Sequence, residues 1–197
     1  MRALFVFVLM LATGLPAWSQ AVDAMSSILL ISRKDMRDPF FRDSVVLVTH
    51  RFGDMPMGLI LNRPTGIVVA TAVPEASKRP RSEVVSFGGP VAIEDLVVVF
   101  RAKNPPADAV EVLDGVYLSM KRQTMNELLA RDPPLKDIRF FAGYAAWGRG
   151  QLEAEVGRGD WHFMRADAAL IFEKRPETLW RDLEPRASVK PMSLPPY

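Results

Sequence analysis

Side chains suited to acid–base catalysis or metal binding are sparse in this sequence. Of its 197 residues two are histidines, His50 and His162, and there is no cysteine. Without cysteine the chain has no disulfide bond and no thiol nucleophile, and two isolated histidines without clustered carboxylates do not form a metal-site pattern. We therefore expect no catalytic residue of a recognised type, no metal and no cofactor.

Ser44 and His50 are the one serine and histidine pair that we considered as a nucleophile and its base. They are six residues apart, at the two ends of a predicted strand. At about 3.3 Å per residue, a strand separates them by about 20 Å, far beyond hydrogen-bond reach. The sequence also lacks a G-x-S-x-G turn. A hydrolase without a recognised motif remains an alternative to a non-enzymatic role.

A first motif, MGLILNRPT at residues 57–65, ends a predicted strand on polar residues. Asn62 and Arg63 could present an amide and a guanidinium to an anionic or carbonyl-bearing ligand. The structural alternative is that Pro64 disfavours helix at Arg63, while Asn62 hydrogen-bonds the local backbone. The sequence leaves both interpretations open.

A second motif, FGGPV at residues 87–91, follows another predicted strand. Gly88 and Gly89 could form a sharp turn, or a nest of backbone N–H groups that faces an anion. Pro90 removes one donor from such a nest, so the pattern favours the turn.

A third motif, GYAAWGRGQLE at residues 143–153, leaves a strand and enters a predicted helix at Gln151. Glu153 and Glu155 in the first turns would repel a phosphate from this helix start. Tyr144 and Trp147 would either pack in the core or line a ligand pocket. We predict that the three motifs converge and that a ligand-binding site includes residues from each of them: Asn62, Arg63, Gly88, Gly89, Tyr144, Trp147 and Gln151.

Apolar runs rich in β-branched residues, separated by turn signals, predict most of the secondary structure. Predicted strands cover residues 28–31, 44–50, 57–62, 83–87, 96–101, 112–119, 138–146, 161–165 and 169–172. Predicted helices cover residues 124–130 and 151–156 and a segment that starts at Pro176. Strands outnumber helices without strict alternation. The pattern predicts an α+β fold: a single compact domain with a mixed, largely antiparallel β-sheet flanked by a few short helices.

The N-terminus has the pattern of a secretory signal peptide. Arg2 precedes an apolar run from Ala3 to Leu15, and small residues at Ala17 and Ser19 suit cleavage before Gln20 or a few residues later. The apolar run is shorter than the roughly 20 residues that span a bilayer. We expect a signal peptide at residues 1–19, a periplasmic protein and no membrane span in the mature chain.

Charge is nearly balanced in the mature chain. The full sequence has 25 basic and 23 acidic residues, and loss of residues 1–19 removes Arg2 alone and leaves a net charge of +1. Basic clusters are interspersed with acids, so nucleic-acid binding is not expected, and the partner is an unidentified small molecule or protein. We expect the domain to span residues 27–183 and a proline-rich tail at 184–197 to be disordered.

In order and spacing, the three motifs resemble the YqgE/AlgH family. The resemblance includes DPFFRDSVV at residues 38–46, Trp161 and residues 167–172, so it spans about residues 27–183. It implies one compact domain in a bacterial family without an established biochemical activity, and one member's name is linked to the regulation of alginate synthesis. The usual member is cytoplasmic and lacks a leader. We therefore expect an exported binding or regulatory module, with a cytoplasmic transcription-related regulator as the alternative if the leader is not cleaved.

Export is tested by the N-terminus of the protein in fractionated cells. We expect the periplasmic fraction to contain a chain that begins at Gln20 or within a few residues of it, because the small residues before that position suit signal peptidase. N-terminal sequencing or intact-mass measurement gives the answer. A chain with Met1 intact in the cytosol would contradict export.

Overall fold

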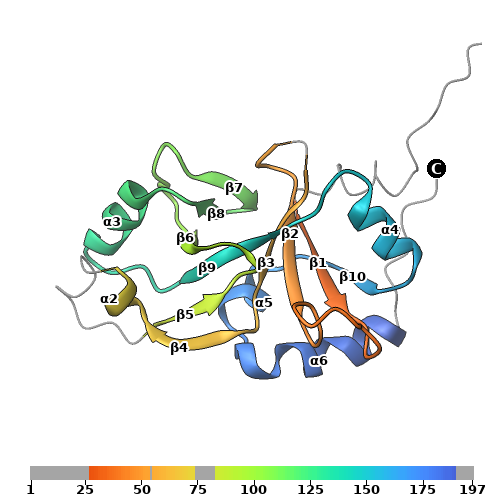
Figure 1. Cartoon of the computed structure of the whole chain (residues 1–197). Coiled ribbons are helices and arrows are strands. Elements are labelled where there is room, and N and C mark those ends of the chain that lie inside the picture. Colours follow the sequence, from red (N-terminus) through yellow and green to blue (C-terminus); the bar gives the residue numbers. More distant parts are fainter. Residues whose placement is uncertain (1–26, 54, 74–82, 190–197) are drawn as a thin grey trace, which may run out of the picture.

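A computed structural model describes residues 27–53, 55–73 and 83–189. Ten strands form one sheet in the order β10-β1-β2-β3-β9-β6-β8-β7, with β5 paired to β9 and β4 paired to β5 (Figure 1). Within the described residues the β5–β9 pair is parallel and the other pairs are antiparallel. The predicted α+β class with a mixed, largely antiparallel sheet is confirmed. The predicted signal peptide lies outside the described residues.

The strands are β1 (Ser27–Ser32), β2 (Val45–Thr49), β3 (Met57–Ile60), β4 (Pro64–Val68), β5 (Val84–Phe87), β6 (Val91–Arg101), β7 (Val110–Leu113), β8 (Val116–Ser119), β9 (Ile138–Ala146) and β10 (Trp161–Arg165). The helices are α2 (Val69–Ala72), α3 (Arg122–Ala130), α4 (Gln151–Gly157), α5 (Ala168–Phe172) and α6 (Pro176–Val189).

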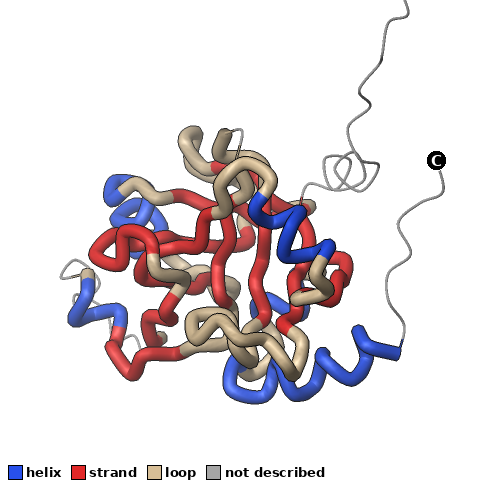
Figure 2. Tube along the Cα trace, turned by 45° about the vertical axis from the view of Figure 1, so that its right-hand side comes forward, coloured by secondary structure: helices blue, strands red, loops and turns tan. Residues whose placement is uncertain are grey.

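The helices lie on the outside of the sheet, and Figure 2 shows them around the strands. Helix α6 packs against β1 and β10, and its Leu179 and Leu183 join a central cluster with side chains from both halves of the sheet. Helix α4 contributes Leu152 to a second cluster on the other face of β1 and β2. Helices α2 and α3 cover β6 and β9 through a third cluster that includes Leu128.

Strand β9 lies between two strands that are consecutive in the sequence. Its residues Phe140–Ala142 pair in parallel with β5 and, at the same time, antiparallel with β6. Because one strand can form such ladders only along its two opposite edges, β5 and β6 lie on either side of β9. The connection between them, residues 88–90, therefore crosses over β9.

The crossing brings two backbones into direct contact, which explains the glycines of the second and third motifs. A Cβ atom on Gly88 would lie 2.2 Å from the carbonyl oxygen of Gly143, and one on Gly89 would lie 2.2 Å from the carbonyl carbon of Tyr144. Gly143 itself has a φ of +67°, and a Cβ atom there would meet the Gly89 carbonyl oxygen at 2.6 Å. Any larger residue would push the two chains apart.

Backbone hydrogen bonds join all three motifs around this crossing. The Gly88 carbonyl accepts from Ile60 N–H at 2.9 Å, and the Gly88 N–H donates to Ala142 at 2.8 Å. The Phe87 N–H donates to the Arg63 carbonyl at 2.7 Å. The predicted convergence of the motifs is confirmed.

Two predicted strands are wrong. Residues 169–172 belong to helix α5, because the Asp167 carboxylate caps its start by accepting from Ala169 N–H at 2.8 Å. Residues 112–119 are not one strand: Asp114-Gly115 turns the chain between β7 and β8, with Gly115 at a φ of +67°. Strand β4 and helix α2 were not predicted from the sequence.

The disorder predicted for residues 184–197 is wrong for its first part. Helix α6 continues through Pro185 to Val189. Glu184 is 5% exposed and Ala187 1% exposed, and the Glu184 carboxylate lies 3.4 Å from the Lys34 ammonium. Burial of Ala187, four residues after the buried Leu183, stabilises the helix past its proline. Residues 190–197 lie outside the described residues.

Replacing Gly89 by alanine tests the crossing. We expect Gly89→Ala to lower the free energy of unfolding by about 3 kcal/mol or more, because the methyl group would meet backbone atoms that cannot move aside. Urea denaturation followed by circular dichroism measures this change. Gly157→Ala is the matched control, since nothing lies within 4 Å of its Cβ position. Equal stability of the two variants would contradict the close approach.

Candidate functional site

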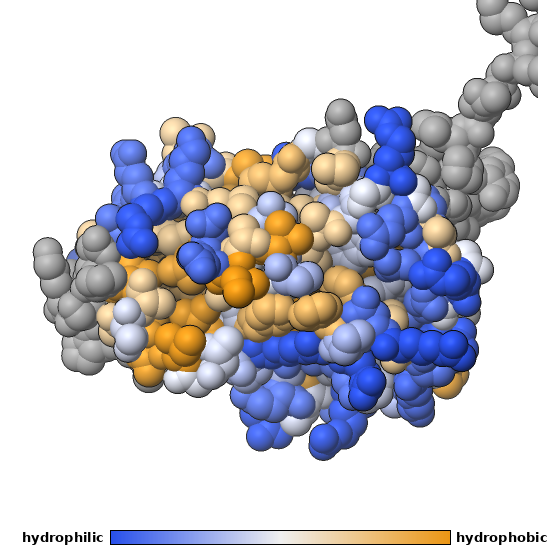
Figure 3. All heavy atoms as spheres, in the orientation of Figure 1, coloured by the Kyte–Doolittle hydropathy of each residue, from blue (hydrophilic) through white to orange (hydrophobic). Residues whose placement is uncertain are grey.

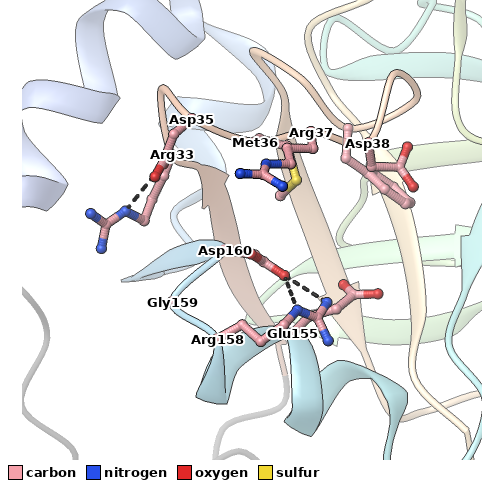
Figure 4. Close-up of a pocket in the computed structure, with 10 residues that line it drawn as sticks. Arg33, Asp35, Met36, Arg37, Asp38, Glu155, Arg158, Gly159 and Asp160 are labelled. Atoms are coloured by element: carbon pink, nitrogen blue, oxygen red, sulfur yellow. Dashed lines mark hydrogen bonds and ion pairs between the residues drawn. The ribbon is translucent and has the colours of Figure 1, made fainter.

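A pocket of about 600 Å³ lies between the segment after β1 and the end of α4 (Figure 4). We call it the charged pocket. Its upper side is formed by residues 33–41 and its lower side by residues 155–160. The lining side chains are mostly ionisable: Arg33, Asp35, Met36, Arg37, Asp38, Phe41, Glu155, Arg158, Gly159 and Asp160.

Glu155 holds the lower wall together. One carboxylate oxygen accepts hydrogen bonds from two indole N–H groups, those of Trp147 at 2.9 Å and Trp161 at 3.0 Å. The other oxygen accepts from the Gln151 amide at 3.0 Å, and the Gln151 carbonyl oxygen accepts from Gly148 N–H at 3.1 Å. Neutral donors stabilise a carboxylate without cancelling its charge. Glu155 has no basic side chain within 4.0 Å among the described residues.

Phe41 provides an aromatic surface on the upper wall. Its ring stacks on Trp147 with the ring centroids 5.7 Å apart and meets Trp161 edge-on with the centroids 5.5 Å apart. These contacts fix the ring beside the Glu155 carboxylate. An aromatic ring next to a carboxylate is an environment that favours a cation.

Most other charges around the pocket are already compensated. The Arg158 guanidinium donates two hydrogen bonds to one Asp160 oxygen, at 3.0 and 2.7 Å, and Arg33 lies 3.6 Å from Asp35.

Arg37 is an exposed guanidinium without an ion-pair or hydrogen-bond partner among the described residues. Asp38 also lacks an ion pair among them, and its carboxylate accepts a hydrogen bond from Phe40 N–H at 2.8 Å. Among its described lining residues the pocket therefore offers two carboxylates, Glu155 and Asp38, and one guanidinium, Arg37, without an ion pair.

Asn62 and Arg63 hold the loop that carries Phe41. The Asn62 amide accepts from Val45 N–H and donates to the Asp43 carbonyl, both at 2.8 Å, and the Arg63 guanidinium donates to the Arg42 carbonyl at 2.7 Å. Burial lowers the pKa of Arg63, while the nearby carboxylates of Asp43 and Asp38 act in the opposite direction. Both side chains use their polar groups to fix the loop.

The structure thus distributes the seven predicted site residues among three places. Asn62, Arg63, Trp147 and Gln151 support the walls of the charged pocket without lining it. Gly88 and Gly89 form the crossing, and Tyr144 lines a different pocket.

Comparison with known proteins agrees with this fold. A profile of the AlgH-like family matches residues 29–191, which is most of the chain. The chain belongs to the AlgH-like family. The resemblance to the YqgE/AlgH family is confirmed.

Relatives of this AlgH-like protein are similar over nearly their whole length. A UPF0301 protein of Methylococcus capsulatus is 33% identical over 161 residues, which cover 80% of this chain and 88% of the relative. A UPF0301 protein of Xanthomonas campestris is 30% identical over 178 residues, covering 88% and 94%.

Two solved structures are similar to this AlgH-like protein. The solution structure of the AlgH protein from Pseudomonas aeruginosa has a TM-score of 0.67 at 25% identity and covers 84% of this chain and 89% of its own. Protein DIP2367 from Corynebacterium diphtheriae has a TM-score of 0.68 at 23% identity, with 85% and 88% covered, and supports the fold alone.

The serine and histidines of this AlgH-like protein that were considered for hydrolysis do not form a catalytic pair. The Ser44 hydroxyl donates to the Phe41 carbonyl at 2.7 Å, and its N–H donates to the Ser32 hydroxyl at 2.8 Å. Buried Nε2 of His50 has no hydrogen-bond partner in the described part of the chain. Burial and then the positive charge of Arg33 lower the pKa of His162.

The described ranges contain neither a metal site nor a membrane-spanning helix. Residues 27–53, 55–73 and 83–189 contain no group of three or more His, Asp or Glu side chains able to hold a metal ion. Among their helices none combines the length and apolarity needed to cross a bilayer.

The residues that line the charged pocket of this AlgH-like protein were not predicted from the sequence. Arg37, Phe41 and Glu155 come from two segments more than a hundred residues apart, and no local pattern joins them. One available signal was the helical spacing of Gln151 and Glu155, which places the amide one turn from the carboxylate it binds.

Loss of the Glu155 charge tests its role in the wall. We expect Glu155→Gln to lower the free energy of unfolding by about 1–3 kcal/mol, because the two indole hydrogen bonds would go to a neutral acceptor and the amide nitrogen cannot accept the third bond, from Gln151. The comparison uses urea denaturation at neutral pH, with the exposed Glu173→Gln as control. Unchanged stability of Glu155→Gln would show that the bridge does not stabilise the fold.

Proposed function

We propose that this AlgH-like protein is an exported, non-enzymatic binding module that holds a small zwitterionic ligand in the charged pocket. The observation that supports this most directly is the Glu155 carboxylate, which lines the pocket beside Phe41 and has no cationic partner among the described residues. Export rests on the leader sequence at residues 1–19.

The cationic end of the ligand would bind near Glu155. A primary ammonium there would gain a charge-assisted contact with the carboxylate and the face or edge of the Phe41 ring. Trp147, Trp161 and Gln151 hold the carboxylate in place before the ligand arrives, so little ordering accompanies binding.

The anionic end would bind Arg37. Its guanidinium lines the same pocket and suits a carboxylate, which it can contact through two parallel hydrogen bonds. The paired charges, Arg158–Asp160 and Arg33–Asp35, also line the pocket and offer further polar contacts. A volume of about 600 Å³ accommodates an amino acid or a short peptide.

Three forms of one dipeptide separate the two charges. We expect alanyl-alanine to raise the melting temperature of the purified mature protein, because it carries both an ammonium and a carboxylate. N-acetyl-alanyl-alanine lacks the cation and alanyl-alanine amide lacks the anion. Each should bind at least about tenfold more weakly, since a hydrogen bond to a charged group contributes about 1.5–3 kcal/mol. Thermal shift and titration calorimetry measure both effects.

Arg37→Gln is the variant that assigns the anionic end, and Arg175→Gln is its control, because both arginines are exposed and Arg175 lies outside the pocket. In Arg37→Gln the dipeptide and its amide should bind equally, while Arg175→Gln should behave as wild type. No stabilisation by the free dipeptide, or equal binding of all three forms by wild type, would refute the proposal.

A further inference from the structure

A second pocket, of about 620 Å³, lies at the C-terminal end of β9, beside Tyr144. We call it the methionine pocket. The connection between β2 and β3, the residue after β8 and the end of β9 supply its lining: Phe52, Gly53, Met55, Pro56, Met57, Met120, Tyr144, Ala146 and Arg149.

The methionine pocket is separate from the charged pocket because successive residues of β9 point to opposite faces. Tyr144 packs against the central cluster, whereas Ala145 and Trp147 are buried in the cluster beneath α4. Trp147 supports the charged pocket from that second face. A ligand in one pocket therefore does not contact the other.

Apolar side chains at the methionine pocket are incompletely covered. Met55 is 55% exposed and Met120 is 37% exposed. Met120 also borders a neighbouring hollow lined by Ile93 and Leu96. Apolar side chains gather over β4, β5 and β6 in Figure 3, while α6 is polar. Burying such surface against an alkyl chain is favourable, and flexible thioether side chains adapt to its shape.

Two polar groups at the pocket are available to a ligand. The Arg149 guanidinium is exposed and has no ion pair among the described residues. The Tyr144 hydroxyl has no hydrogen-bond partner among them. Arg149 is the only charged side chain among the described lining residues. A mostly apolar lining with the Arg149 cation is complementary to a molecule with an apolar body and one anionic group.

We propose that the methionine pocket binds a medium-chain alkyl monocarboxylate, with the alkyl chain against Phe52, Met55 and Met120 and the carboxylate at Arg149 and Tyr144. The charge of Arg149 selects a carboxylate over a neutral or cationic head group of the same chain length. This site is independent of the zwitterion site, so either proposal can fail alone.

Titration calorimetry with decanoate, below its critical micelle concentration, tests the site. Wild type should bind decanoate, and decyltrimethylammonium and acetate should bind at least about tenfold more weakly, because the first lacks the anion and the second lacks the chain. Absence of decanoate binding, or equal binding of decanoate and decyltrimethylammonium, would overturn the proposal.

Two variants locate the bound molecule. Arg149→Gln and Met120→Gln change exposed side chains and should each weaken decanoate binding about tenfold or more while leaving the circular dichroism spectrum and alanyl-alanine binding unchanged. The matched controls are Arg175→Gln and Val84→Gln, since Val84 is 38% exposed and lies outside the pocket. Decanoate binding that is the same in all four variants would mean adsorption elsewhere, and the site would be rejected.

Discussion

The crossing of two backbones at Gly88, Gly89 and Gly143 is the constraint on which the rest of the structure depends. Residues 88–90 carry the chain from one edge of β9 to the other, and the separation of the two chains leaves no space for a Cβ atom. The crossing fixes the position of β9 relative to β3 and thereby the place where Trp147 enters the sheet's second face. Trp147 then positions both Phe41 and Glu155, so the charged pocket rests on the glycines without containing them.

The sequence predicted the parts of the fold that depend on local pattern. Apolar runs rich in β-branched residues located β1, β2 and β9, and the glycines before Gln151 located the start of α4. The glycine, proline and aromatic content that the motifs share at strand ends predicted their convergence. The errors in secondary structure arose where a one-residue signal was set against a longer sequence pattern. The Asp167 cap was outweighed by the apolar run after it, and the prolines near the C-terminus concealed the spacing of Leu183 and Ala187.

The candidate site was predictable only in part, for a physical reason. Asn62, Trp147 and Gln151 stand out in sequence because turns and helix starts need particular residue types, and these residues proved to support the walls. Residues that face the ligand have no such local requirement. Arg37 and Glu155 are candidate ligand contacts because they line one pocket and neither has an ion-pair partner among its described residues. That arrangement depends on tertiary contacts between segments distant in the sequence.

Strand β9 carries Tyr144 to one pocket and Trp147 to the other through the alternation of its side chains. Inserting or deleting a single residue between Phe140 and Trp147 would exchange the two faces and misplace both side chains together. Sequence length in this segment is therefore fixed even where residue types can vary.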